Sequence, residues 1–146
     1  MKLSTRIRYG TRAVTYIACY AKNKPVSLRQ MCEHESIPIK YLESILLSLK
    51  KAHIIDSIRG SRGGYLLKRS PQSITLYDII KALSGKIAII DCIETDDCIK
   101  KDTCVFTEVW NEINSSIINK VQSIYLSDIL KRLEDKKLCA IPMFHI

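Results

Sequence analysis

Three evenly spaced cysteines are the residues best suited to chemistry in this chain. Cys92, Cys98 and Cys104 are each separated by five residues. The surrounding segment, 84–105, has no helical or strand periodicity and predicts a loop, in which three thiolates can converge on one centre. Thiolates select soft partners such as iron–sulfur clusters or zinc. The spacing differs from the Cys-x2-Cys pairs of zinc knuckles, which favours an iron–sulfur cluster.

Three thiolates leave the fourth position of such a centre open. It could be a non-cysteine residue, a small molecule or a group from a partner subunit. Reactive thiols without metal are the alternative, but the carboxylates of Asp96, Asp97 and Asp102 should raise the thiol pKa values, which argues against bare thiolates. The chain shows no export signal, so a disulfide framework is not expected. Cys19 and Cys32 are interpreted as buried apolar residues, and Cys139 has no evident partner.

The amino-acid composition limits the classes of protein to which this chain can belong. The 146 residues are 47% apolar, enough for one folded core. No run of about eighteen apolar residues occurs, so no membrane span is expected. The first residues are basic and lack the apolar segment of a signal peptide, which predicts a cytoplasmic protein.

The net positive charge of the chain comes from its first half. Residues 1–75 hold 14 Lys and Arg against 4 Asp and Glu, a net charge of +10, whereas residues 76–146 hold 9 against 11, a net charge of −2. This asymmetry suggests that the first half meets a polyanion, although a solvated basic surface would look the same.

The first half has the pattern of a winged helix-turn-helix. A helix over 5–20 precedes a capping box, Ser27 and Gln30, and then a short helix that ends near His34. Pro38 suits the first position of a third helix, which runs to about residue 52 and should bury Leu42, Ile45, Leu46 and Leu49. The strand pattern at 54–58, three glycines within 60–64 and the apolar run at 65–67 predict a hairpin wing.

In such a fold the second helix of the motif enters the major groove and the wing reaches the backbone or the minor groove. Glu43 could accept a hydrogen bond from a cytosine amino group, or it could simply pair with Lys40 or Lys50. Arg6 and Lys50 are further candidates for phosphate contacts. The predicted DNA-binding residues are Arg8, Arg29, Lys40, Tyr41, Glu43, Ser44, Lys51, Arg59, Ser61, Arg62 and Gly63.

The second half predicts three helical segments around the cysteine loop. A short helix covers 73–83 and another covers 127–134. Between them, a long helix starts at Phe106 with an apolar seam that continues through Trp110 and Ile113 to Ile124. So long a narrow seam calls for a partner helix, either from a second copy of the chain or from its own core. The expected division is 1–83 for DNA binding, 84–105 for the cluster, 106–134 for dimerisation and 135–146 as a tail. The fold class is mainly α with a small β-hairpin wing.

The chain resembles the IscR/NsrR/CymR family of bacterial winged-helix repressors over about residues 1–134. The opening MKLSTRIRYG, the step at residues 41–43, the wing at residues 59–67 and the cysteine spacing look like the IscR branch. The resemblance implies a homodimer with crossed long helices on a near-palindromic double-stranded DNA operator. It also implies a cluster, 2Fe–2S in preference to 4Fe–4S, that reports iron–sulfur status, oxygen or nitric oxide. In that branch the glutamate that matches Glu43 is thought to filter operator sequences.

The chain departs from both branches at the fourth ligand. The IscR branch has a histidine three residues after the third cysteine, where this chain has Thr107. The NsrR branch uses an acidic residue of the partner's first helix, and residues 1–32 contain none. Candidate substitutes are Asp102, Glu108, Cys139 and His145.

Three other functions fit the sequence less well. An enzyme needs a nucleophile–base pair or paired carboxylates in a pocket, and the sequence shows neither arrangement. A cluster-free regulator switched by thiols or zinc would use the same fold and would be colourless. A pure interaction module would leave the basic wing without a purpose. We therefore expect a regulator in which cluster loading alters the placement of the recognition helix or the exposure of Glu43.

Overall fold

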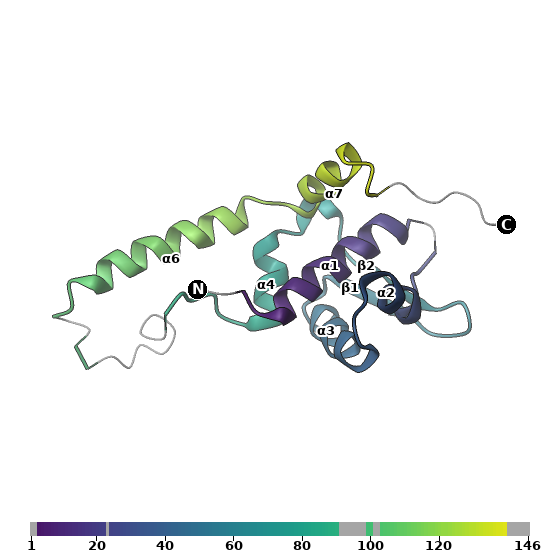
Figure 1. Ribbon diagram of the computed structural model, residues 1–146, viewed down its shortest axis with the longest axis horizontal. Helices are drawn as coiled ribbons and strands as arrows, with labels where there is room; N and C mark the ends of the chain where they lie inside the picture. The colour runs from purple at the N-terminus through teal and green to yellow at the C-terminus, as the bar shows by residue number, and fades with distance from the viewer. Residues whose placement is uncertain (1–2, 23, 91–98, 101–102, 140–146) are drawn as a thin grey trace.

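The computed structural model describes residues 3–22, 24–90, 99–100 and 103–139. The predicted fold class, mainly α with one hairpin, is confirmed. In chain order the elements are α1 (Thr5–Tyr20), α2 (Leu28–Glu35), α3 (Ile39–Lys51), β1 (Ile55–Ile58), β2 (Gly64–Leu67), the 3-10 turn η1 (Pro71–Ser73), α4 (Leu76–Ser84), α6 (Phe106–Gln122) and α7 (Leu126–Asp135), as Figure 1 shows.

Side-chain caps fix where the helices of the first half begin. The Ser27–Gln30 capping box is confirmed, with the Ser27 N–H donating to Gln30 Oε1 at 2.9 Å and the Gln30 N–H to Ser27 Oγ at 3.2 Å. Pro38 is the N-cap of α3 and not its first helical residue, because its ψ of 135° is extended. The Pro38 carbonyl still accepts from the Leu42 N–H at 3.0 Å, so the helix starts one residue later than predicted.

The core lies between α1, α3 and α4. The predicted stripe of α3 is fully buried, as are Ile17 of α1 and Ile79 of α4. Gly10 lets α1 approach α4 closely, because a Cβ there would stand 2.2 Å from Leu83 Cδ1. Because α3 buries one side in this three-helix core, its opposite side faces outward.

The wing is the antiparallel hairpin of β1 and β2, in the register Ile55 opposite Leu67 and Ile58 opposite Gly64. The N–H groups of Val26 and Tyr65 each donate to the other residue's carbonyl, at 2.9 and 2.8 Å, which ties the hairpin to the chain before α2. Gly64 has a φ of 153°, and a Cβ there would lie 2.4 Å from the Val26 carbonyl oxygen. Glycine is therefore required where the wing meets the body.

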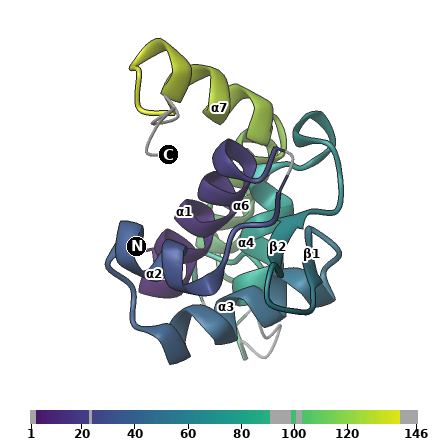
Figure 2. The same cartoon turned by 90° about the vertical axis from the view of Figure 1, so that its right-hand side faces the viewer.

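Helix α6 projects from the body as an arm, whereas α7 returns to it (Figure 1). Backbone hydrogen bonds hold the α6–α7 junction to the start of α4, from the Leu76 N–H to the Ile124 carbonyl and from the Leu126 N–H to the Ile74 carbonyl, both at 2.8 Å. Helix α7 then packs on α1, as Figure 2 shows. No helix among the described residues is long and apolar enough to cross a membrane.

The cysteines differ from expectation in one respect. Cys19, at the end of α1, is buried as predicted but forms a disulfide with Cys139, across 120 residues of sequence. The interpretation of Cys19 as a purely apolar residue, and of Cys139 as a residue without a partner, is therefore wrong. Cys32 is a free, buried thiol, as predicted.

Candidate nucleic-acid interface and cysteine site

The outer face of α3 is the part of the helix-turn-helix that is free to meet a ligand. Lys40 and Glu43 are exposed, and no ion pair between described residues includes either one. The alternative pairing of Glu43 with Lys50 is not formed, because Lys50 Nζ lies 4.0 Å from Asp56 Oδ1 instead. Leu47, one turn after Glu43 and outside the buried stripe, is 55% exposed. Sequence reasoning missed Leu47, although its absence from the stripe was the signal that it faces outward.

Tyr41 and Ser44, also predicted to face DNA, are half-buried and engaged within the protein. The Tyr41 ring packs edge-on against the Tyr9 ring, with centroids 5.9 Å apart. Ser44 Oγ donates to the Tyr41 carbonyl at 2.9 Å. The ring contact holds α3 against α1, and DNA contacts by the two residues stay predictions.

Arg6 joins three helices through its guanidinium group. It donates to Ser44 Oγ (3.1 Å), the Ser44 carbonyl (3.1 Å) and Ser48 Oγ (2.7 Å) on α3, and to the Leu83 carbonyl (3.1 Å) at the end of α4. These four hydrogen bonds engage Arg6 within the protein, and a phosphate contact by Arg6 stays a prediction. Within the protein, Arg6 links the recognition helix to the segment that leads into residues 84–105.

Replacing Arg6 with leucine should lower the free energy of unfolding by about 2–4 kcal/mol, because partly buried acceptors on α3 and α4 lose their donors. Chemical denaturation followed by far-ultraviolet circular dichroism measures this change. Arg8→Leu is the matched control, since Arg8 is exposed on the same helix, and it should change stability by no more than about 0.5 kcal/mol. Equal effects at the two positions would contradict the role assigned to Arg6.

The wing tip presents free cations. Arg59, Ser61 and Arg62 are exposed, and neither arginine has an ion-pair partner among the described residues. The turn is closed by the Gly63 N–H, which donates to the Gly60 carbonyl at 3.0 Å. Two unpaired guanidinium groups on a protruding turn are suited to phosphates or to a narrow minor groove.

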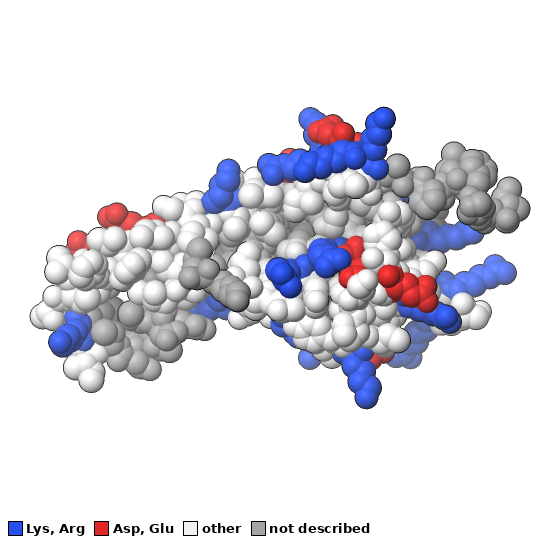
Figure 3. Space-filling model, in the orientation of Figure 1, with Lys and Arg blue, Asp and Glu red and all other residues white. Residues whose placement is uncertain are grey.

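The other predicted phosphate contacts lie on three helices, α1, α2 and α3. Arg8 and Lys51 are exposed, and Arg29 is exposed but paired with Glu33 at 2.8 Å. In Figure 3, Lys and Arg side chains project from the lower and right-hand edges of the body, where Figure 1 places α2, α3 and the hairpin. The basic half of the sequence thus forms a basic surface beside the recognition helix.

Only one cysteine of the trio can be placed, because Cys92 and Cys98 lie outside the described residues. Cys104 is a free, half-buried thiol just before α6. The hydrogen bond from the Phe106 backbone N–H, and next the one from the Thr107 side chain, hold the pKa of the Cys104 thiol below its ordinary value. The expectation of a raised pKa is wrong for Cys104, because hydrogen-bond donors at the start of α6 lower it.

This environment tests whether Cys104 suits a cluster. A thiolate is the form that binds iron, and the start of α6 stabilises the thiolate of Cys104. Thr107, at the position of the missing histidine, contributes a hydrogen bond to the sulfur. Within the described ranges no three His, Cys, Asp or Glu residues cluster as a metal site. The donor that can be placed therefore fits a thiolate-bound group.

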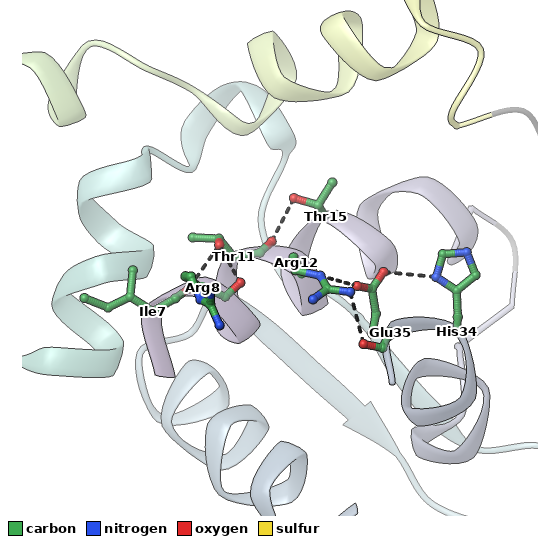
Figure 4. Close-up of polar contacts among 7 residues, drawn as sticks. All are labelled: Ile7, Arg8, Thr11, Arg12, Thr15, His34 and Glu35. Atoms are coloured by element: carbon green, nitrogen blue, oxygen red, sulfur yellow. Dashed lines mark hydrogen bonds and ion pairs between the residues drawn. The ribbon is translucent and has the colours of Figure 1, made fainter. Parts of the chain in front are cut away.

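A groove runs along α1 on the side that faces α7. It has a volume of about 640 Å³ and is bounded by α1, the end of α2, and α7. Figure 4 shows its polar wall, where Glu35 accepts from Arg12 Nε at 2.5 Å and lies 3.0 Å from His34 Nδ1. This cluster holds the end of α2 to α1, so the groove touches the helix-turn-helix directly.

Helix α6 leaves an apolar face uncovered. Phe106, Val109, Trp110 and Ile113 are 37–62% exposed and recur at helical spacing. Asn114, one turn after Trp110, is the buried residue of α6, and α6 also contacts α4. An exposed stripe of large apolar side chains at this spacing is typical of a helix–helix interface.

Comparisons with known proteins agree with this arrangement. A family model described as Rrf2, iron-dependent transcriptional regulator, matches residues 3–132. The chain is 34% identical over 140 residues to protein rrf2 of Nitratidesulfovibrio vulgaris, covering 95% of this chain and 91% of that protein. The solved structure of T. potens IscR is similar with a TM-score of 0.78 at 32% identity, covering 99% of this chain and 97% of that one. CymR, the global cysteine regulator of B. subtilis, has a TM-score of 0.75 at 30% identity, covering 90% and 98%.

Proposed function

Because the chain belongs to the Rrf2 family of iron-dependent transcriptional regulators, we propose that it is a cytoplasmic, homodimeric repressor that senses iron–sulfur status, oxygen or nitric oxide. It is a DNA-binding transcriptional regulator and not an enzyme. The sensing group that we propose is a 2Fe–2S cluster held by Cys92, Cys98 and Cys104. Its target is a near-palindromic double-stranded operator. The division into residues 1–83, 84–105, 106–134 and 135–146 assigns these roles along the chain.

The exposed pattern on α3 and the wing supports the DNA contacts. Lys40, Glu43 and Leu47 form the free outer face of α3, and a leucine can contact a thymine methyl group. Arg59 and Arg62 meet the flanking backbone or minor groove. The unpaired carboxylate of Glu43 would be repelled by the operator phosphates. A hydrogen bond accepted from a cytosine amino group would offset this repulsion, so Glu43 would select operators that place a cytosine there.

The single observation that carries the cluster is the evenly spaced trio Cys92, Cys98 and Cys104 in one segment of the chain. The donors at the start of α6 lower the pKa of the Cys104 thiol, which favours the form that binds iron. A bound cluster would supply a redox- and ligand-sensitive state at this end of the molecule. The signal has a path through protein contacts, since the segment with the cysteines follows α4, whose Leu83 carbonyl is bonded to Arg6. Arg6 also holds Ser44 and Ser48, so a shift at the end of α4 would reach the recognition helix.

A cluster-free regulator is the second candidate. The same lowered pKa would make Cys104 a reactive thiol. Similarity to CymR, the global cysteine regulator of B. subtilis, supports this second candidate. The two candidates predict different metal contents.

Cys104→Ser tests the cluster directly. The anaerobically purified wild type should contain iron and acid-labile sulfide in equal amounts and absorb in the visible range. The variant should lose most of both, because serine is a poor ligand for iron in these clusters. Cys32→Ala is the control, since Cys32 is the other free cysteine among the described residues, and it should keep the full content. A colourless wild type that takes up no iron and sulfide on reconstitution would reject the cluster in favour of the second candidate.

A further inference from the structure

The chain carries a second thiol site apart from the cysteine trio. Cys19 and Cys139 form a disulfide with a Cα–Cα distance of 5.9 Å, within the range that disulfides require. Cys19 is 5% exposed at the end of α1, and Cys139 is half-buried. Disulfides in reducing compartments are usually transient and redox-sensing. We propose that Cys19 and Cys139 are a peroxide-responsive dithiol pair that fixes α7 onto α1.

The end of α7 is built to bring Cys139 to this place. The Leu138 N–H donates to the Leu133 carbonyl at 2.9 Å, and the Lys137 N–H to the Glu134 carbonyl at 2.9 Å. Lys137 has a φ of 55°, so the chain leaves the helix through a left-handed residue and turns back. These are the two hydrogen bonds of a Schellman motif. The turn exists in the backbone independently of the disulfide, and it directs residues 138 and 139 toward α1.

The disulfide lies at the edge of the groove described above. Cys19 and Leu138 both line the groove, together with Tyr16 of α1 and Leu133 of α7. Joining the sulfurs holds the wall formed by α7 against the wall formed by α1. Tyr16 also packs on His34 of α2, with ring centroids 4.8 Å apart. The oxidised pair therefore tightens an assembly that includes the helix-turn-helix.

The accessibility of the two sulfurs sets the order of the chemistry. The more exposed thiolate of Cys139 attacks one peroxide oxygen, the O–O bond breaks, and hydroxide leaves to become water on protonation. The Cys19 sulfur then attacks the Cys139 sulfenic acid, so that the S–S bond forms, the S–O bond breaks and the second oxygen leaves as water with the Cys19 proton. Two thiols lose two electrons, and one hydrogen peroxide becomes two waters. A dithiol reductant reverses the reaction by thiol–disulfide exchange.

The test treats the reduced, full-length protein with hydrogen peroxide, blocks free thiols, and maps tryptic peptides without reduction. We expect one linked species, peptide 13–22 joined to peptide 138–146, which reduction separates. Linkage of peptide 138–146 to peptide 87–100 or 102–120, which carry the trio, would overturn the proposal. So would an oxidised protein in which Cys139 is still free.

A second measurement follows the effect on α7. In hydrogen exchange, α7 amides should be more protected in the oxidised wild type than in the reduced one, and Tm should rise by about 5 °C or more. Cys139→Ser should show neither change on treatment with peroxide, whereas Cys32→Ala should respond like the wild type. An equal response of Cys139→Ser and wild type would overturn the proposal. Iron and sulfide content is a separate readout, so loss of the cluster hypothesis would leave this result unaffected.

Discussion

Glutamate at both Trp110 and Ile113 should convert the proposed dimer into a monomer and lower operator affinity by at least about 100-fold. These side chains are 37% and 40% exposed on a helix arm that the body leaves uncovered on this side. Burying a large apolar side chain contributes about 1.5–3 kcal/mol, and a twofold interface loses four such residues at once. That loss weakens the affinity of one subunit for the other by several factors of ten. A monomer binds only one half-site of the operator. It therefore loses the additional affinity that a dimer has because its two DNA-binding domains are linked.

Sedimentation velocity gives the oligomeric state, and an operator-shift titration at fixed salt gives the affinity. The matched control is Ser115→Glu with Asn119→Glu, two exposed polar positions on the same helix. It adds the same charge away from the apolar face and should remain dimeric. A dimeric Trp110/Ile113 variant would show that the second copy docks elsewhere, and a monomeric control would show that charge alone separates the subunits.

Local patterns explain why most of the fold could be predicted from the sequence. The capping box at Ser27 and the α3 stripe depend on residues three or four positions apart, and each is visible in the sequence. Pro38 was misplaced by one position because a proline suits both the cap and the first helical turn. Errors of this size do not change which face of α3 is exposed.

The contacts that sequence reasoning missed join residues far apart along the chain. Arg6 looked like another surface cation, and its partners at Ser44, Ser48 and Leu83 are 38 to 77 positions away. Cys19 and Cys139 are 120 positions apart, and only the turn after α7 brings them together. Composition carries no record of such pairings, because they follow from the packing of complete helices.

The cysteine site shows the same limit at shorter range. The loop carboxylates were a reasonable guide to thiol pKa, but Cys104 lies next to the first N–H groups of α6, which act more directly on its sulfur. Thr107 could be recognised as a substitution for histidine, yet its hydrogen bond to the sulfur depends on where the helix begins. The cysteines indicated a thiolate site, whereas the lowered pKa of the Cys104 thiol depends on where α6 begins.

The wing should supply a large part of the salt-dependent affinity. Arg59→Ala with Arg62→Ala removes two exposed, unpaired guanidinium groups from each subunit. Each lost phosphate contact reduces the slope of log affinity against log salt by about 0.9, so the loss of four contacts per dimer should reduce the slope by about 3.6. At moderate salt we expect operator affinity to drop by about 100-fold, measured by fluorescence anisotropy across a salt series.

Lys131→Ala with Arg132→Ala provides the comparison, because it removes the same charge from exposed positions of α7, away from the wing. That variant should keep the slope of the wild type and nearly all of its affinity. If the two double variants reduced the salt slope equally, the net charge of the protein, and not the position of the wing arginines, would determine the salt dependence of operator affinity. A wing double with a normal slope would mean that Arg59 and Arg62 do not reach the DNA, and Lys40 and Lys51 on the recognition helix would then carry the backbone contacts.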